Sequence, residues 1–106
     1  MINYNDAEAA LNYLVGTDEE FGRAKTMSDA LYEQRKTIQA TQFLKAIGSA
    51  AERTQKALAS NEYKEHLGFI RDAQIDFEIL RAKRLTNQCI IEMWRSVNSN
   101  ARKGNI

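Results

Sequence analysis

The sequence predicts an all-α fold: a long antiparallel, coiled-coil-like helical hairpin with short flanking helices, which dimerises into a helical bundle. Three observations lead to this prediction. The 106 residues include no Pro and only five Gly, too few turn residues for a β-rich or loop-rich fold. Glycine followed by Ser or Thr marks two points where one helix ends and another begins. Apolar residues recur at alternating steps of three and four, the spacing of helices that pack side by side.

Signals for helix starts divide the chain into four helices. A small polar residue stands three positions before Glu at each of three places, which is the capping-box arrangement. These boxes are Asn5…Glu8, Thr17…Glu20 and Ser49…Glu52, and Gly16 and Gly48 precede the last two. Ser60 is a further candidate cap, although a continuous helix over residues 50–98 stays open. The prediction is one helical domain, 1–106, with a short helix at 6–15, a long helix at 18–47, a short helix at 50–59, a long helix at 61–98 and a flexible tail at 99–106.

Both long helices carry an apolar stripe at heptad spacing. The first stripe consists of Phe21, Ala24, Ser28, Leu31, Ile38 and Lys45. The second consists of Ile70, Ala73, Phe77, Leu80, Ile91 and Trp94, with Tyr63 and Leu67 extending it backwards. A single helix cannot bury such a stripe, so we expect the two to pack together. The residues expected to form the core or the contact between copies are Leu31, Ile38, Ile70, Phe77, Leu80, Ile91 and Trp94.

Four polar residues interrupt these stripes. Arg35 and Gln42 stand at stripe positions of the first long helix, and Arg84 and Asn87 stand in the second. Polar residues in a helix seam lower stability and specify register or partner. The alternative, left open here, is that they lie at the edge of an imperfect seam.

Charge favours the antiparallel arrangement. Residues 1–33 hold seven acidic and two basic residues, a net charge of −5, whereas residues 79–106 hold six basic and one acidic, a net charge of +5. A hairpin places the acidic segment beside the basic one. Each exposed pair contributes only ~0–1 kcal/mol, so the main effect is on alignment.

The hairpin leaves apolar residues uncovered. The chain has 31 large apolar or aromatic residues, more than one seam uses. Ile75, Ile79, Leu85, Ile90 and Met93 fall off the main stripe of the last helix. The helix at 6–15 can cover some of them, and a second copy of the chain can cover the rest. We therefore expect a homodimer.

Residues that could carry enzyme chemistry are few. His66 is the only histidine, with Glu62 and Glu65 nearby, whereas a bundle metal site needs Glu-x-x-His pairs from two helices. Cys89 lies beside Ile90 and Ile91, is expected to be buried, and stands far from His66 along the same helix. No Gly-rich phosphate loop is present. We expect no catalytic site, no metal and no cofactor.

A basic cluster near the C-terminus is the candidate contact surface for nucleic acid or a protein partner. It consists of Arg81, Lys83, Arg84, Arg95, Arg102 and Lys103, with Trp94 alongside. Basic residues beside an aromatic ring suit single-stranded DNA, but the net charge of +1 is low for a dedicated DNA-binding protein. Trp94 continues the apolar stripe, which favours core packing. We expect Arg81 and Arg84 to pair across the hairpin. The main contact residues are then expected to be those nearest the C-terminus, Arg95, Arg102 and Lys103.

Four short motifs are distributed along the chain: Tyr13-Leu14-Val15, Glu52-Arg53, Glu62-Tyr63 and Trp94-Arg95-Ser96. In these motifs the sequence resembles small uncharacterised proteins of tailed bacteriophages and prophages, of the kind found near genes for single-strand annealing recombination. The resemblance spans nearly the whole chain. The chain departs from the group at Asn98–Arg102, where the group often has Asn-Ala-Asn-Arg-Arg. The resemblance implies no functional residues.

The resemblance and the residues together lead to one expectation about function. The resemblance implies a role in phage DNA recombination or replication, in the bacterial host cytoplasm. A lone cysteine fits that reducing compartment, and no apolar stretch approaches the ~20 residues that span a membrane. We expect a non-enzymatic helical interaction module that contacts protein or single-stranded DNA and no membrane. The alternative is a small phage protein that binds and inhibits a host factor.

Overall fold

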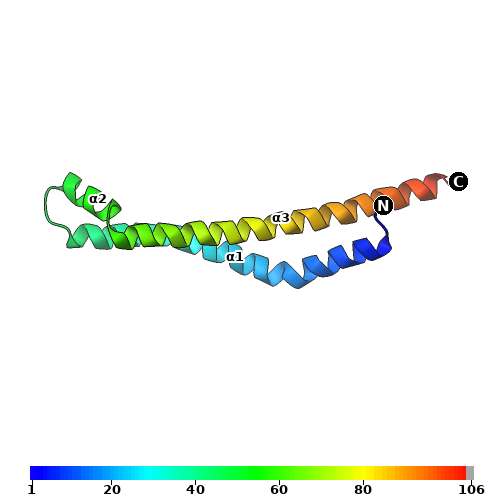
Figure 1. The fold of residues 1–106 in the computed structure, drawn as a ribbon, viewed down its shortest axis with the longest axis horizontal. Coiled ribbons are helices and arrows are strands. Elements are labelled where there is room, and N and C mark those ends of the chain that lie inside the picture. The colour runs from blue at the N-terminus through cyan, green and yellow to red at the C-terminus, as the bar shows by residue number, and fades with distance from the viewer. Residues whose placement is uncertain (105–106) are drawn as a thin grey trace. The chain divides into compact units, whose positions relative to one another are not determined.

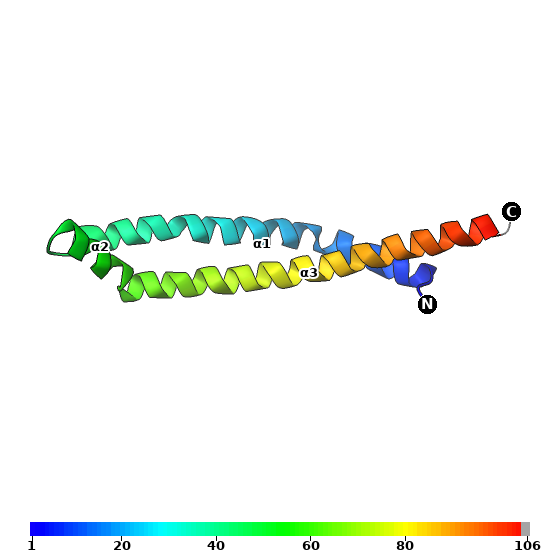
Figure 2. The ribbon, with the colours of Figure 1, turned by 90° about the horizontal axis from the view of Figure 1, so that it is seen from above.

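The computed structural model describes residues 1–104, and over that range the chain is all-α, as predicted. It consists of α1 (Tyr4–Lys45), α2 (Ala50–Leu58) and α3 (Asn61–Gly104). Helices α1 and α3 pack against each other and run in opposite directions (Figures 1 and 2). The antiparallel pair of long helices is therefore confirmed.

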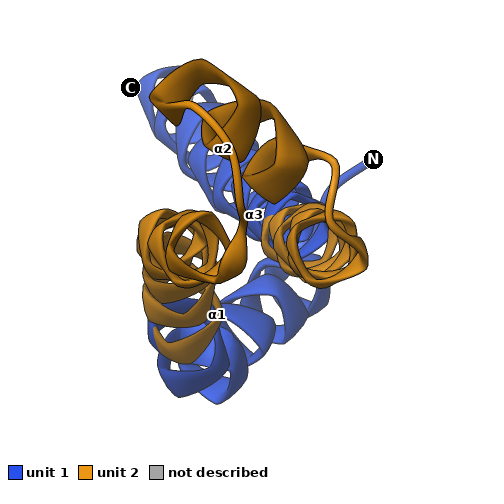
Figure 3. Ribbon diagram, turned by 90° about the vertical axis from the view of Figure 1, so that its left-hand side faces the viewer, with its two compact units in different colours: residues 1–22, 78–106 blue, residues 23–77 orange. Residues whose placement is uncertain are grey.

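The chain divides into two compact units, each containing a segment of α1 packed on a segment of α3 (Figure 3). Unit 1 comprises Met1–Gly22 and the described part of Glu78–Ile106, and unit 2 comprises Arg23–Phe77, which includes α2. The single domain expected over residues 1–106 stays a prediction.

The seam between α1 and α3 follows a heptad pattern in each unit. In unit 1 the partly or fully buried residues at this spacing are Ala7, Ala10, Leu14, Thr17 and Phe21 on α1, facing Leu80, Arg84, Asn87, Ile91 and Trp94 on α3. In unit 2 they are Ala24, Ser28, Leu31, Arg35, Ile38 and Gln42, facing Tyr63, His66, Ile70, Ala73 and Phe77. No large side chain among residues 1–104 is fully buried. The core is one thin layer between two helices.

The predicted break at Gly16-Thr17 is wrong, because α1 runs through it without interruption. The Thr17 hydroxyl donates a hydrogen bond to the Tyr13 carbonyl oxygen, 2.8 Å away, as Ser and Thr do inside helices. The three-and-four spacing of the seam continues across Gly16. Packing along this stripe offsets the roughly 1 kcal/mol that a helical glycine costs.

Helix α1 begins earlier than its predicted cap at Asn5…Glu8. The capping box is Asn3…Asp6: the Asp6 N–H donates to Asn3 Oδ1 at 3.0 Å, and the Asn3 N–H donates to Asp6 Oδ2 at 2.9 Å. Asn3…Asp6 and Asn5…Glu8 have the same three-residue spacing, and the box nearer the N-terminus is the one that caps α1.

The predicted junction at Gly48-Ser49 is present. Ser49 is the N-cap of α2 and its Oγ accepts from the Glu52 N–H at 3.2 Å. Gly48 has φ +131°, a backbone conformation that favours glycine. Arg53 donates from Nε to the Phe43 carbonyl oxygen at 3.2 Å, which satisfies a group at the end of α1.

Ser60 separates α2 from α3, so a continuous helix over residues 50–98 is excluded. Its hydroxyl oxygen accepts from the Tyr63 N–H at 3.2 Å and donates to the Ala57 carbonyl oxygen at 2.7 Å. At the other end α3 continues to Gly104, so residues 99–104 of the expected flexible tail are helical. Residues 105–106 lie outside the described range.

Three further expectations about burial are wrong. Leu67 is 42 % exposed, and His66 takes the seam position instead. Lys45 is exposed at the last residue of α1. Cys89 is exposed rather than buried, because it stands on the side of α3 away from the seam.

The two glycines predicted to end helices give opposite expectations for stability. Gly16 is helical with no atom near an added Cβ, so Gly16→Ala should raise the free energy of unfolding by about 0.5–1 kcal/mol. At Gly48 a Cβ would lie 2.5 Å from a Glu52 carboxylate oxygen in a strained conformation, so Gly48→Ala should lower it by about 1–3 kcal/mol. Chemical denaturation followed by circular dichroism measures both. A loss of stability in Gly16→Ala would contradict the continuous helix.

Candidate interaction groove

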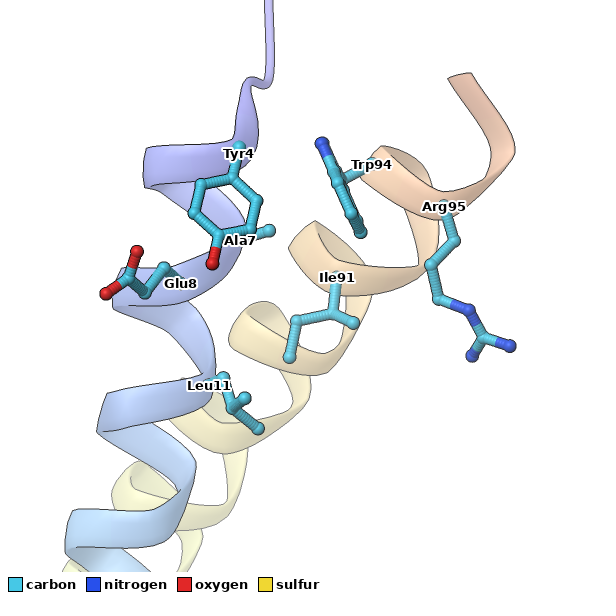
Figure 4. Close-up of a pocket in the computed structure, with 7 residues that line it drawn as sticks. All are labelled: Tyr4, Ala7, Glu8, Leu11, Ile91, Trp94 and Arg95. Atoms are coloured by element: carbon cyan, nitrogen blue, oxygen red, sulfur yellow. The ribbon is translucent and has the colours of Figure 1, made fainter. Parts of the chain in front are cut away.

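Unit 1 contains a mostly apolar groove between the first turns of α1 and the last third of α3 (Figure 4). Tyr4, Ala7, Glu8 and Leu11 line it from α1, and Ile91, Trp94 and Arg95 line it from α3. Its volume is about 170 Å³. An apolar cavity of about 150 Å³ holds a benzene ring. The groove therefore has room for one large apolar side chain.

The groove exists because the seam is filled by small residues at this point. Ala7 and Ala10 are the buried α1 residues here, and neither fills the space beside Ile91 and Trp94. The rings of Tyr4 and Trp94 meet edge to face with centroids 5.9 Å apart. Tyr4 and Leu11 are each more than half exposed. Apolar surface is therefore open to a ligand.

Charges of opposite sign stand at the two edges of the groove. Figure 4 shows the Glu8 carboxylate and the Arg95 guanidinium directed away from the apolar side chains between them. Arg95 donates from Nη1 to Glu92 Oε1 at 2.9 Å, and both side chains are about two-thirds exposed. An exposed pair of this kind contributes little. Arg95, one of the expected contact residues, can therefore exchange Glu92 for another acceptor.

Arg84, one of the predicted contact residues, is instead part of the seam. Its Nη1 donates to the Leu14 carbonyl oxygen at 2.8 Å and to Thr17 Oγ1 at 2.7 Å, and its Nη2 donates to Asp18 Oδ1 at 2.6 Å. Its guanidinium carbon lies 4.9 Å from the centroid of the Phe21 ring. Arg84 thus pairs across the hairpin, as expected, and fixes the register of α1 against α3.

The remaining basic residues lie on the surface of α3. Arg81 pairs with Glu78 of the same helix at 3.1 Å, so the expected pairing across the hairpin is wrong for this residue. Lys83, Arg102 and Lys103 are exposed. Arg81, Arg95 and Arg102 are spaced by multiples of seven and share one side of α3. They form a basic edge along α3, and of the three only Arg95 lines the groove.

The predicted seam residues form the core within one chain. Leu31, Ile38, Ile70 and Phe77 lie in the seam of unit 2, and Leu80, Ile91 and Trp94 lie in the seam of unit 1. Ile91 and Trp94 also line the groove. A second copy would have to use other residues.

His66, the residue considered for a metal site, is part of the seam in the described part of the chain. The buried His66 ring lies with Nε2 2.6 Å from the Leu31 carbonyl oxygen, which holds it in the seam of unit 2. Within residues 1–104, no three His, Cys, Asp or Glu side chains are grouped to hold a metal ion.

The α1 side of the groove was missed from the sequence. Tyr4 and Leu11 are seven residues apart and therefore share a helix face, which is the signal that could have located them. The assumed helix start after Asn5 excluded Tyr4 from that face.

Comparison with protein-family models, curated proteins and solved structures finds no match. None of the helices over residues 1–104 combines the length and apolarity of a membrane span.

Arg84 should be the most sensitive polar residue of unit 1. Its side chain is 13 % exposed. Arg84→Ala removes its charged hydrogen bonds to Leu14, Thr17 and Asp18, and should lower the free energy of unfolding by about 1–3 kcal/mol. Asp18 is 64 % exposed, and Asp18→Asn should cost no more than about 1 kcal/mol. Urea denaturation measures the pair, and equal losses would contradict a register held mainly by the contacts of Arg84 to the Leu14 carbonyl and Thr17.

Proposed function

We propose that this chain is a non-enzymatic interaction module that binds an amphipathic α-helix of a protein partner in the groove of unit 1. The observation that carries the proposal is the groove itself, open apolar surface between two helices with one acidic and one basic edge. Amphipathic helices dock into such grooves through apolar anchors spaced along one face. One anchor would enter beside Tyr4 and Trp94, and an acidic residue of the partner would face Arg95.

The charges favour a protein over nucleic acid. A phosphate backbone needs a continuous basic surface. Here Glu8 stands at one edge of the groove, and Arg81, Arg84 and Arg95 are each paired with a carboxylate. Exposed Arg102 and Lys103 extend the basic edge toward the end of α3 and would steer an acidic partner.

The biological setting rests on the resemblance to phage and prophage proteins. It supports a role accessory to phage DNA recombination or replication in the bacterial cytoplasm, with a recombination or replication protein as the partner. The alternative of a host-factor inhibitor would use the same groove. Self-association is part of the proposal, because large apolar residues of α3 stay exposed outside the hairpin: Ile75, Ile79, Leu85 and Met93.

Trp94 is the chain's only tryptophan and lies in the groove, so its signal should report binding. In ¹⁹F NMR of the 5-fluorotryptophan protein, the phage single-strand annealing protein or single-stranded DNA-binding protein should shift the resonance saturably. Oligo(dT) should leave it unchanged. If only oligo(dT) shifts the resonance, and its affinity falls steeply as salt is added, the partner is DNA and not a protein. No shift with any of the three would overturn the recombination role, and capture of a host protein through the groove would then support the inhibitor.

Two matched pairs of variants test the groove. Leu11→Lys should abolish partner binding, whereas Leu67→Lys, an exposed leucine outside the groove, should not. Arg95→Glu should weaken binding roughly 5- to 10-fold through one lost charge contact, at about 1 kcal/mol. Arg81→Glu is its control. Arg81 also pairs with a glutamate three residues earlier, as Arg95 does, but it does not line the groove. Isothermal titration gives the affinities, and equal effects within either pair would contradict this site.

Reversing the charge of Arg102 and Lys103 tests the end of α3. Both are exposed in the last turn, so Arg102→Glu with Lys103→Glu should slow association with an acidic partner and leave the melting temperature nearly unchanged. Stopped-flow measurements over a range of salt concentrations separate the rates. An unchanged association rate would show that this part of the basic cluster has no role.

A further inference from the structure

Helix α3 carries a second heptad-spaced stripe on the side away from the seam. Its members in unit 1 are Ile79, Ala82, Thr86, Cys89 and Met93, which we call the outer stripe. They follow steps of three and four, and all five are exposed. At 100° per residue the outer stripe lies about 140° around the helix from the seam residues. Helix α1 packs on the seam side, so the outer stripe is open.

We propose that the outer stripe pairs two copies of this chain, α3 against α3 in parallel, with Cys89 facing Cys89 of the second copy. The inference rests on the self-association proposed above and is independent of the groove. Ile79 and Met93 supply the large apolar contacts, and Ala82 and Cys89 are small enough to let the two helices approach closely.

The residues beside the outer stripe identify a second copy as the occupant. Glu78 and Leu85 flank it on one side, and Lys83 and Ile90 flank it on the other. In a parallel pair of identical helices, a flanking residue faces the opposite flank of the partner five positions later. Glu78 then faces Lys83 of the second copy, and Leu85 faces Ile90. Charge meets opposite charge in the first pair, and apolar meets apolar in the second. Glu92, the next residue of that flank, faces Val97 and keeps its pairing with Arg95 of its own helix.

An antiparallel pair lacks this complementarity. There each flank faces the same flank of the other copy. The flank with Glu78, Leu85 and Glu92 would meet itself, and Lys83 would face no carboxylate. The present bond of Glu78 to Arg81 does not prevent the parallel pairing, because both side chains are more than half exposed and such pairs contribute little.

Sedimentation velocity tests the surface with two methionines of equal exposure. Met93 is 57 % exposed in the outer stripe, and Met27 is 58 % exposed on α1. The unaltered chain should sediment as a dimer at micromolar concentration, Met93→Lys as a monomer and Met27→Lys as a dimer. Circular dichroism should show all three equally helical. A monomeric unaltered chain, or dimers of both variants, would overturn the proposal.

Disulfide cross-linking tests the orientation. Oxidised glutathione should convert the chain into a Cys89–Cys89 linked dimer, with two molecules of reduced glutathione released per bond. Cys89→Ser should abolish the link, and Ala82→Cys in that background should restore it. In an antiparallel pair centred on the outer stripe, residue 82 of one copy lies at least about 10 Å from residue 82 of the other, beyond the reach of a disulfide. A dimer that cross-links at neither position would overturn the parallel arrangement.

The readouts separate this inference from the groove. Met93→Lys should leave the partner-induced shift of Trp94 intact, and Leu11→Lys should leave the dimer intact. If the unaltered chain shows the partner-induced shift but does not dimerise, the outer-stripe proposal has failed. If it dimerises but shows no shift, the groove proposal has failed.

Discussion

Two helices in contact can cover only one stripe of each, and the rest of this structure depends on that constraint. The seam uses the heptad positions of α1 and α3, and the buried apolar residues there are few: Ala7, Ala10, Ile70 and Leu80. Many large apolar residues that fall off the seam stay exposed, among them Ile75, Ile79 and Met93. A third helix would normally cover such residues, but α2 has only nine residues and packs at the turn. The exposed apolar surfaces are therefore a consequence of the architecture, and they account for both proposed contact surfaces.

Two polar residues in the seam, Arg84 and His66, contact backbone groups of the opposite helix, whereas Arg35 and Asn87 donate to carbonyl oxygens of their own helices. Arg84 reaches the Leu14 carbonyl in unit 1, and His66 reaches the Leu31 carbonyl in unit 2. A shift of α1 by one turn would break these contacts, whereas a purely apolar seam of small residues would tolerate several registers. The polar seam positions were expected either to specify register or partner or to lie at the edge of an imperfect seam. Arg84 matches the first interpretation, because it specifies the register.

The seam could be predicted from the sequence because its spacing repeats over many turns. Leu31, Ile70 and Leu80 were placed correctly for that reason. The local signals were less reliable. Gly48-Ser49 ends a helix and Gly16-Thr17 does not, although the two pairs look alike. The difference is that the apolar spacing continues through Gly16 and stops before Gly48. Cys89 was misplaced because its apolar neighbours Ile90 and Ile91 were given more weight than helix phase. Leu67 was misplaced because residues 66 and 67 both fit a three- or four-residue step between Tyr63 and Ile70, and His66 takes the buried position. Predicting the α1 side of the groove required knowing where α1 begins. The sequence offers two capping boxes of equal spacing, Asn3…Asp6 and Asn5…Glu8, and the structure uses the first.

The contacts across the hairpin span increasing lengths of chain from the turn outward. Arg53 and Phe43 are 10 residues apart, His66 and Leu31 are 35 apart, and Arg84 and Leu14 are 70 apart. The entropy cost of closing a loop rises with its length, but only slowly once the shorter loops inside it have formed. Folding can therefore proceed as a zipper that starts at α2, and opening can proceed in the reverse order. Amide protons of α1 near the N-terminus would then exchange earlier than those beside α2. In that order of folding, the residues that line the groove would be the last to close, and a bound helix would add most to local order there.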